Sequence, residues 1–296
     1  MPDRVPQDPV FVGSPPVEVL DAPGAMRAWS LARRASDGRI AVVPTMGALH
    51  AGHLALIEEA RRHASTVIVS IFVNPIQFDR ATDFDRYPRT IDDDLAACRV
   101  AGVHAVYAPT ASVMYPPGFQ TKVVPGDLAG SLEGEMRPGH FEGVTTVVTK
   151  LLAATLPDVA VFGQKDYQQL AIVRRMVADL DLGVEIVGSP TVREADGLAL
   201  SSRNVRLSPE DRAAAVVIPI ALRDAAEACA GGELDAGQLR AIALRRFDLE
   251  PRAKVEYVAV VDAATLEPVT VVDRPAVVLV AVWFGDVRLI DNVILS

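Results

Sequence analysis

Short apolar runs alternate with helix-length amphipathic segments through the first two-thirds of the chain, and this alternation constrains the fold most. The apolar runs occupy residues 39–45, 65–74, 103–109, 159–163 and 184–192. Segments with helical spacing of apolar residues occupy 52–63, 92–102, 141–158 and 166–181. Continuous apolar strands joined by helices are typical of a parallel sheet covered on both faces. The sequence therefore predicts a doubly wound, Rossmann-like α/β domain.

The pattern changes after about residue 192, which indicates a second unit. Ser208 can cap a helix that has Pro209 at its first position, and Pro219 predicts a kink or break within that helix. Another helix is expected at 235–247, followed by apolar runs at 254–262, 276–284 and 287–295. Gly285–Asp286 suits a tight hairpin. We therefore expect a first domain at 1–191, with 1–16 as a loose leader, and a smaller α+β domain at 192–296 that covers the site.

Composition excludes some classes of function. The chain has 29 Lys and Arg against 38 Asp and Glu, a net charge of −9, which argues against a broad nucleic-acid surface. Cys98 and Cys229 are far apart and outside any metal-ligand spacing, so reduced thiols in a cytoplasmic protein are expected. No apolar run reaches membrane-spanning length, and the proline-rich N-terminus lacks the pattern of a secretory signal.

The stretch "TMGALHAGH" follows the first strand and opens a helix. Its glycines, Gly47 and Gly52, allow backbone amides to approach a ligand, and a helix N-terminus favours an anion. His50 and His53 are three residues apart, so both point to the same side, where they can donate to a phosphate. Two polar residues that cap a turn are the simpler interpretation of this spacing alone. Zinc is a weaker one, because no further His or Cys completes a site.

Two other strands also end in polar residues. In "FVNPIQF", Asn74 and Gln77 are neutral amides suited to a carboxylate or hydroxyl, although turn-stabilising amides would look the same. In "VFGQKDYQQL", Lys165 brings a cation, Asp166 can cap the next helix and Gln169 lies one turn further. Since ligands of open α/β sheets bind beyond the carboxyl ends of the strands, these groups are candidates for a site, with a solvated lysine as the alternative.

Two loops add candidates for phosphate and metal binding. "LALSSRN" places Ser201, Ser202 and Arg203 at the predicted domain junction, where they could clamp a phosphate or serve only as a linker. Asp92–Asp94 could be ordinary first-turn acids of a helix. They could also hold magnesium, which binds through one or two carboxylates together with substrate phosphates.

In combination these motifs resemble one family. "PTMGALHAGHLALI", "SIFVNPIQF", "DFDRYPRT", "RPGHFEGVTTVVTKLL", "FGQKDYQQL" and "VREADGLALSSRN" occur in order over about 39–207, and are similar to the pantoate–beta-alanine ligases (pantothenate synthetases) of the HIGH-motif nucleotidyltransferase superfamily. The resemblance implies an enzyme with ATP as a substrate and Mg²⁺ as a cofactor. Pantoate would attack the α-phosphorus of ATP to give pantoyl adenylate, and beta-alanine would then displace AMP. The family also implies a homodimer.

The resemblance assigns roles to individual residues. The implied catalytic residues are His50, His53, Lys165 and Arg203. The implied ATP-binding residues are Met46, Gly47, Ala48, Leu49, His50, Ala51, Gly52, His53, Gly163, Gln164, Lys165, Asp166, Val192, Leu200, Ser201, Ser202 and Arg203. Gln77 and Gln169 would bind pantoate or beta-alanine, and Asp93 and Asp94 would bind the metal. The family assigns His53 as a proton donor. We expect electrostatic stabilisation instead, because a carboxylate nucleophile has no proton to lose.

Some features depart from the family, and other functions stay open at this point. Gln164 stands where many members have glutamate, and Leu200 where methionine is common. Arg137 and His140 are expected near the site without an assigned step. The alternatives are a simple nucleotidyltransferase and a nucleotide-binding regulator that has lost catalysis. The acidic chain shows no tRNA-binding module, which disfavours an aminoacyl-tRNA synthetase.

Overall fold

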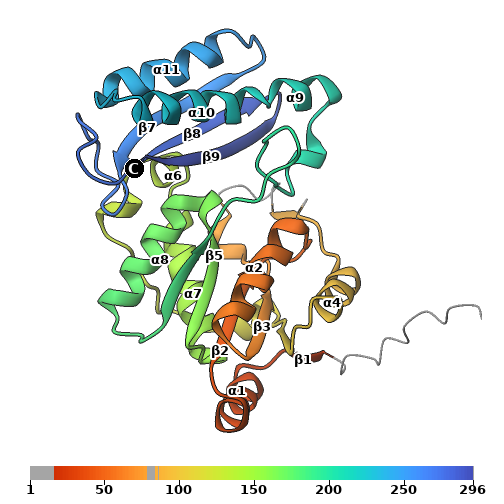
Figure 1. Ribbon diagram of the computed structural model, residues 1–296. Coiled ribbons are helices and arrows are strands. Elements are labelled where there is room, and N and C mark those ends of the chain that lie inside the picture. The colour runs from red at the N-terminus through yellow and green to blue at the C-terminus, as the bar shows by residue number, and fades with distance from the viewer. Residues whose placement is uncertain (1–16, 79–83, 86, 296) are drawn as a thin grey trace, which may run out of the picture.

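The fold consists of a parallel sheet wrapped by helices and a smaller antiparallel sheet that lies against it (Figure 1). The structure is a computed structural model that describes residues 17–78, 84–85 and 87–295. The predicted leader at 1–16 lies outside the described residues, as do Asp83 and Arg86 of the "DFDRYPRT" motif.

Six parallel strands form the first sheet. They are β1 (Glu18–Leu20), β2 (Ile40–Thr45), β3 (Thr66–Ile71), β4 (Ala105–Tyr107), β5 (Val159–Gly163) and β6 (Glu185–Ser189). Their order is β1-β4-β3-β2-β5-β6. From β2 the chain builds outward through β3 and β4, and then returns to place β5 on the other side of β2. This reversal is a topological switch point, where parallel sheets open a crevice for ligands.

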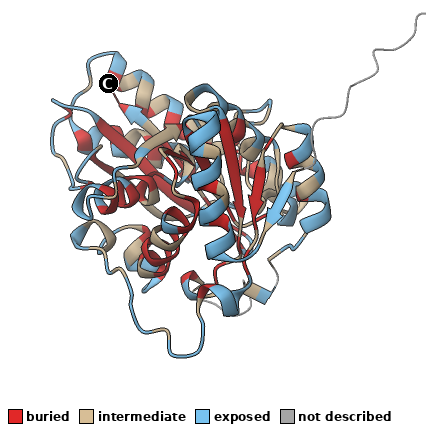
Figure 2. Cartoon of the chain, turned by 90° about the horizontal axis from the view of Figure 1, so that it is seen from below, coloured by how far each residue is buried: buried red, intermediate tan, exposed pale blue. Residues whose placement is uncertain are grey.

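Helices cover both faces of this sheet. They are α1 (Pro23–Asp37), α2 (Ala51–His63), α4 (Ile91–Val100), α7 (His140–Thr155) and α8 (Tyr167–Asp179). Side chains of α1, α7 and α8 pack on one face, where Ile40 and Val42 lie. Those of α2 and α4 pack on the other, where Ala41 and Val43 lie. The central strands β2 to β5 are accordingly buried between helices, whereas the edge strand β1 is more exposed (Figure 2), and the predicted doubly wound fold is confirmed. The sequence prediction did not include β1 or α1.

A three-stranded antiparallel sheet forms the C-terminal part. The sheet consists of strands β7 (Lys254–Asp262), β8 (Ala276–Phe284) and β9 (Val287–Leu295), and it is preceded by helices α9 (Pro209–Ala214), α10 (Val217–Ala230) and α11 (Ala236–Asp248). The predicted break near Pro219 falls just before it, between α9 and α10, so that the proline occupies the first turn of a new helix where its missing N–H is not needed. Gly285, with φ +58°, turns β8 directly into β9.

The antiparallel sheet is covered on both sides. Helices α10 and α11 pack on one face (Figure 1). On the other, Val261, Val277 and Leu279 pack against Tyr167 and Ala171 of α8. This second contact joins the two sheets next to the end of β5. The predicted domain boundary at 191/192 falls between β6 and α9 and stays a prediction. No helix among the described residues has the length and apolar character needed to cross a membrane.

Candidate active site

A cleft of about 300 Å³ opens at the carboxyl ends of β2 and β5, at the switch point of the sheet. Volumes of this order are common for small-molecule sites. The cleft brings together predicted residues from separate segments of the chain. Those that line it are Met46, His50, Gly52, His53, Gln77, Gly163, Lys165, Asp166, Gln169, Val192, Leu200, Ser201, Ser202 and Arg203.

The turn after β2 is held by its own side chains and by one buried carboxylate. Gly47 has φ +82° and Ala48 has φ +51°. A Cβ on Gly47 would lie 2.9 Å from Oδ2 of Asp94, so glycine is required there. Asp94 accepts hydrogen bonds from the backbone N–H of Ala48 at 3.0 Å and of Leu49 at 2.7 Å. The carboxylate therefore fixes the conformation that presents the two histidines.

The histidines cap their helix in a reciprocal manner. Nδ1 of His50 accepts from the backbone N–H of Gly52 at 3.1 Å, and Nδ1 of His53 accepts from the backbone N–H of His50 at 3.2 Å. Burial lowers the pKa of His53 to about 4, assisted by His50. Burial, followed by the charge of Lys165, also lowers the pKa of His50. Both rings are thus neutral at pH 7, and because Nδ1 is an acceptor, Nε2 carries the proton. Each ring can donate that proton in a hydrogen bond.

The backbone amides of the turn, which the sequence predicts to approach a ligand, are hydrogen-bonded to side chains of the protein itself. The N–H of Gly47 is bound by Oγ1 of Thr45. Those of Ala48 and Leu49 are bound by Asp94, and those of His50 and Gly52 by the histidine rings. Gly47, Ala48, Leu49 and Ala51 are also outside the lining of the cleft. The turn therefore contributes mainly imidazole groups, and its glycines serve its shape.

Gln77 is oriented by a buried network on the opposite wall. It belongs to the short helix η1 (Pro75–Gln77), and its Nε2 lies 3.3 Å from Sδ of Met46. Asn74 donates to Oε1 of Gln77 at 2.9 Å and accepts from the hydroxyl of Tyr115 at 2.7 Å. Asn74 is almost fully buried, so it positions Gln77. No sequence signal pointed to Tyr115, which lies 41 positions away from Asn74.

Arg137 and His140 extend this wall. Nδ1 of His140 lies 2.8 Å from the carbonyl oxygen of Gln77, and its Nε2 lies 3.2 Å from Nη1 of Arg137. Burial, followed by the charge of Arg137, lowers the pKa of His140 to about 4. The neutral ring thus donates from Nδ1 to Gln77 and accepts from Arg137. Both residues line the cleft.

Lys165 and Gln169 follow β5. Lys165 belongs to the short helix η3 (Gln164–Asp166). Nδ2 of Asn292 in β9 donates to the carbonyl oxygens of Gln164 at 2.9 Å and Lys165 at 3.0 Å, which anchors this helix. The first of the two adjacent glutamines, Gln168, is buried and donates to the carbonyls of Leu128 and Ser131. Gln169 lines the cleft, as the sequence predicted.

The loop that carries Arg203 is anchored to the C-terminal sheet. The N–H of Arg203 donates to Oγ of Ser201 at 3.2 Å. At the start of the loop, Arg193 forms two hydrogen bonds to the buried Asp291 of β9, at 2.6 and 3.1 Å. Lys165, Arg203 and Arg206, together with Arg137, give the cleft a positive lining. The lining also includes a set of apolar side chains, namely Phe72, Val144, Val147, Val148, Leu151 and Phe162.

The expected metal ligands do not converge on the cleft. Both carboxylate oxygens of Asp94 face the amides of the histidine turn, and Asp93 is exposed on α4 outside the cleft lining. No group of three or more His, Cys, Asp or Glu side chains with the geometry of a metal site occurs in the part of the chain that the structure describes. The Asp94 carboxylate therefore holds the backbone of the turn, and magnesium binding by Asp93 and Asp94 stays a prediction.

Comparison with known proteins agrees with this geometry. The family model for pantoate-beta-alanine ligase matches residues 18–294. The chain belongs to the pantoate–beta-alanine ligase family. A pantothenate synthetase of Salinispora arenicola (strain CNS-205) is 55% identical over 263 residues, which cover 88% of this chain and 92% of that protein. One from Thermobifida fusca (strain YX) is 53% identical over 273 residues, or 90% and 92% of the two chains.

Solved structures of pantoate–beta-alanine ligases share the fold. The pantothenate synthetase of Thermus thermophilus has a TM-score of 0.88 at 45% identity, and the match covers 94% of this chain and 99% of that one. The ligase of Francisella tularensis, complexed with beta-gamma ATP and beta-alanine, has a TM-score of 0.76 at 33% identity, covering 94% and 97%. This chain is therefore an enzyme of the ligase family, and the family predicted from the motifs is confirmed.

Proposed function

We propose that this chain condenses (R)-pantoate with beta-alanine, using ATP, to give pantothenate, AMP and pyrophosphate through a pantoyl adenylate. One observation carries the proposal. The cleft lining holds two sets of residues: cationic and imidazole side chains, and two amide side chains together with apolar ones. The first set suits a triphosphate. The second suits the carboxylate, hydroxyls and paired methyl groups of pantoate. The Francisella ligase that was solved with beta-gamma ATP and beta-alanine is a relative of the same fold.

In the first step a carboxylate oxygen of pantoate attacks the α-phosphorus. A carboxylate–phosphorus bond forms, the bond from the α-phosphorus to the bridging oxygen breaks, and pyrophosphate leaves with the electron pair. Nucleophile and electrophile are both anionic, so donors must offset the charge that develops. Lys165 and Arg203 supply positive charge, and the neutral rings of His50 and His53 donate from Nε2 to phosphate oxygens.

In the second step the uncharged amine of beta-alanine attacks the acyl carbon. A carbon–nitrogen bond forms, the acyl–oxygen bond to the phosphate breaks, AMP leaves, and the nitrogen releases a proton. Gln77 and Gln169 hold the pantoyl group in this step as in the first, since neutral amides can bind its oxygens without adding charge. Holding both reactants in one cleft removes most of the orientational barrier.

The proposal includes a magnesium ion that is bound together with the nucleotide. Mg²⁺ prefers phosphate oxygens and water with one or two carboxylates, and Asp166 is the carboxylate that lines the cleft among the described residues. When bound, the ion would neutralise phosphate charge, and Asp166 is the residue available to hold it. A homodimer and a cytoplasmic location, which the resemblance and composition predict, stay predictions. Sedimentation of the purified chain tests the first.

Product analysis tests the function. With ATP, magnesium and pantoate alone, the enzyme should release pyrophosphate and retain pantoyl adenylate. Addition of beta-alanine should then yield equal amounts of AMP and pantothenate. Omission of pantoate is the control and should abolish pyrophosphate release. A product that keeps the nucleotide after beta-alanine is added would instead identify a simple nucleotidyltransferase, and ATP binding without pyrophosphate release would identify a regulator.

A further inference from the structure

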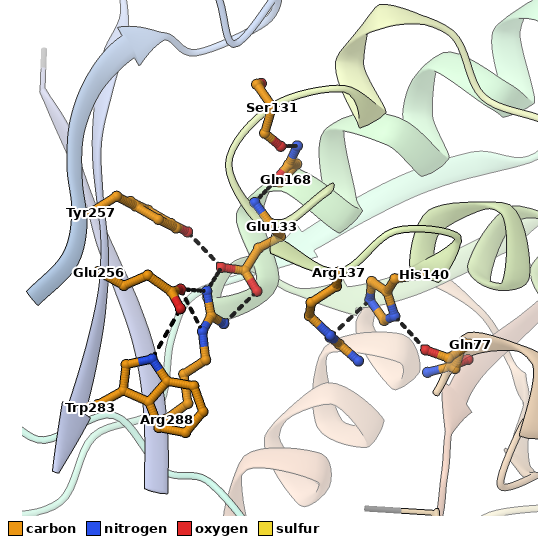
Figure 3. Close-up of polar contacts among 10 residues, drawn as sticks. All are labelled: Gln77, Ser131, Glu133, Arg137, His140, Gln168, Glu256, Tyr257, Trp283 and Arg288. Atoms are coloured by element: carbon orange, nitrogen blue, oxygen red, sulfur yellow. Dashed lines mark hydrogen bonds and ion pairs between the residues drawn. The ribbon is translucent and has the colours of Figure 1, made fainter. Parts of the chain in front are cut away.

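A buried ion pair joins the wall of the cleft to the C-terminal sheet. Arg288 of β9 donates two parallel hydrogen bonds to Glu133, each 2.7 Å long, across 155 positions of sequence. Glu133 opens the short helix α6 (Glu133–Met136). The two side chains are only 15% and 10% exposed. The hydroxyl of Tyr257 in β7 donates a third hydrogen bond to Glu133, at 2.7 Å (Figure 3).

This pair is better suited to fix a position than to add stability. Burial alone would raise the pKa of Glu133, but the hydrogen bonds and charge of Arg288 outweigh burial and hold that pKa below its usual range. Taking two charges out of water costs about as much as their attraction returns, so apolar side chains could stabilise the same contact equally well. A bidentate guanidinium–carboxylate pair, in contrast, sets both distance and angle. The contact therefore defines where α6 lies.

From Glu133 a continuous set of hydrogen bonds leads to Gln77. The carbonyl oxygen of Glu133 accepts from the N–H of Arg137 at 2.9 Å. The guanidinium of Arg137 donates to Nε2 of His140, and Nδ1 of His140 donates to the carbonyl oxygen of Gln77 (Figure 3). Gln168 holds the N–H of Glu133 from the other side at 2.9 Å.

We propose that Glu133 and Arg288 are positioning residues for the pantoate end of the cleft. Through α6 they fix Arg137 and His140, and thereby the backbone of Gln77. Neither touches the substrates, and the nucleotide end has its own anchors on β9, Asp291 and Asn292. Loss of the pair should therefore weaken the use of pantoate more than the use of ATP. This inference rests on the proposed function, in which Gln77 binds pantoate.

The same arginine offers a matched control. Arg288 also donates from Nε to Glu256 at 2.7 Å, and Nε1 of Trp283 donates to Glu256 at 3.0 Å. All three of these residues belong to the antiparallel sheet. Glu256→Gln thus removes one carboxylate from Arg288 within that sheet, whereas Glu133→Gln removes the one that crosses to the cleft wall.

The experiment compares the steady-state kinetics of Glu133→Gln, Glu256→Gln and the unaltered enzyme, with Gln77→Ala as the reference for direct loss of the pantoate contact. Glu133→Gln should raise the KM for pantoate by about tenfold, a size typical of small misplacements in a site, and leave the KM for ATP within about twofold. Glu256→Gln should leave both constants within about twofold. Thermal unfolding verifies that each variant is folded.

The proposal is overturned if Glu133→Gln and Glu256→Gln have the same kinetic constants, or if the KM values for pantoate and ATP rise together. Should Glu133→Gln not fold, Tyr257→Phe takes its place, because it removes one hydrogen bond to Glu133 and leaves the ion pair. A smaller rise confined to the KM for pantoate then supports the proposal, and unchanged KM values overturn it. An unaltered enzyme that makes no pantothenate would refute the proposed function itself, separately from these comparisons.

Discussion

Strands β2 and β9 serve the same cleft in opposite ways. The turn that follows β2 places two histidines in its lining. β9 contributes no residue to that lining in the described chain, yet its side chains anchor two segments that do, and also the short helix α6, which precedes the lining residue Arg137. Arg288 holds α6, Asp291 holds the loop after β6, and Asn292 holds η3. The turn after β2 supplies side chains that line the cleft, and β9 fixes the position of segments around it.

The comparison shows that the antiparallel sheet is part of the site. A cover that only excluded water would pack against the first sheet through apolar contacts, such as those of Leu279 with α8. Three polar anchors on one strand, each directed to a different segment of the cleft wall, go beyond that role. Groups in a preorganised site need support of this kind, because catalysis is sensitive to displacements of about 1 Å or less.

The largest effect should come from the residues that face the cleft. Lys165→Ala removes a cation from the predicted phosphate end, and His53→Ala removes a donor. We expect each to slow formation of the adenylate by on the order of a hundredfold or more, as for other preorganised electrostatic groups, with the fold retained. Single-turnover release of pyrophosphate measures the step. Near-normal rates in both variants would contradict the assignment and leave β2 with only a structural role.

Cleft residues that directly follow a strand, such as His50 and His53 after β2, could be predicted from the sequence because their signals are local. A strand, a glycine turn and His50 and His53 at helical spacing all fall within one short segment. The parallel sheet was predicted from the apolar character of its strands, but their order was not, because pairing between strands leaves no local signal. Lys165 and Gln169 were found for the same reason, since each lies close to a strand end.

The β9 residues that support the cleft wall could not be predicted in this way, because their partners are distant in the sequence. Asn292 and Lys165 are 127 positions apart, and nothing near Asn292 in the sequence differs from an ordinary strand. The contact of Asp94 with the histidine turn could not be predicted for a related reason. An acid in the first turn of a helix looks alike whether it holds a metal or a neighbouring backbone, and only the fold shows that it meets Ala48 and Leu49.

Asp94→Asn tests whether Asp94 anchors the turn and should have the next largest effect. The amide keeps one acceptor but turns an N–H toward a backbone donor of the turn. The unpaired group should lower the free energy of unfolding by about 1–3 kcal/mol and slow the adenylation step. Urea denaturation and single-turnover kinetics measure these two quantities.

The dependence of the rate on magnesium distinguishes the two roles of Asp94. An anchor of the turn should leave the half-saturating magnesium concentration unchanged in Asp94→Asn. A shift of about tenfold or more, the size seen when support of a metal ligand is lost, would return Asp94 to the metal. Asp93→Asn provides the control, since Asp93 is exposed on the same helix.

Asn292→Ala should have a smaller effect and tests β9 at the nucleotide end. Two carbonyl oxygens, of Gln164 and Lys165, lose their donor. Because these oxygens are near the cleft and can gain water, we expect a loss of about 1 kcal/mol in transition-state stabilisation, or roughly fivefold in kcat/KM for ATP. The KM for pantoate should change less, the reverse of the result expected for Glu133→Gln. If both constants change equally, β9 acts on the cleft as a whole.

The effect that is smallest at neutral pH concerns the titration of two buried histidines, because it requires acid conditions to appear. The pKa of His140 falls from the usual 6.5 to about 4 through burial and the nearby charge of Arg137. Between these two values the unfolded chain binds a proton that the folded chain does not, so stability is lost as the pH falls from about 6.5 toward 4. At pH 5 this histidine should contribute a loss on the order of 1–2 kcal/mol.

His140→Asn keeps a donor near the carbonyl oxygen of Gln77 and removes the titrating group. The variant should therefore be less stable than the unaltered enzyme at pH 7, where the packing of the ring and its hydrogen bond with Arg137 are lost, and this difference should shrink by on the order of 1–2 kcal/mol at pH 5. His53→Asn should behave similarly, because burial also lowers the pKa of His53 to about 4. Urea denaturation at both pH values measures the change. A difference that does not depend on pH in either variant would mean that folding does not lower the pKa of either ring, and would contradict the argument that burial keeps both rings neutral.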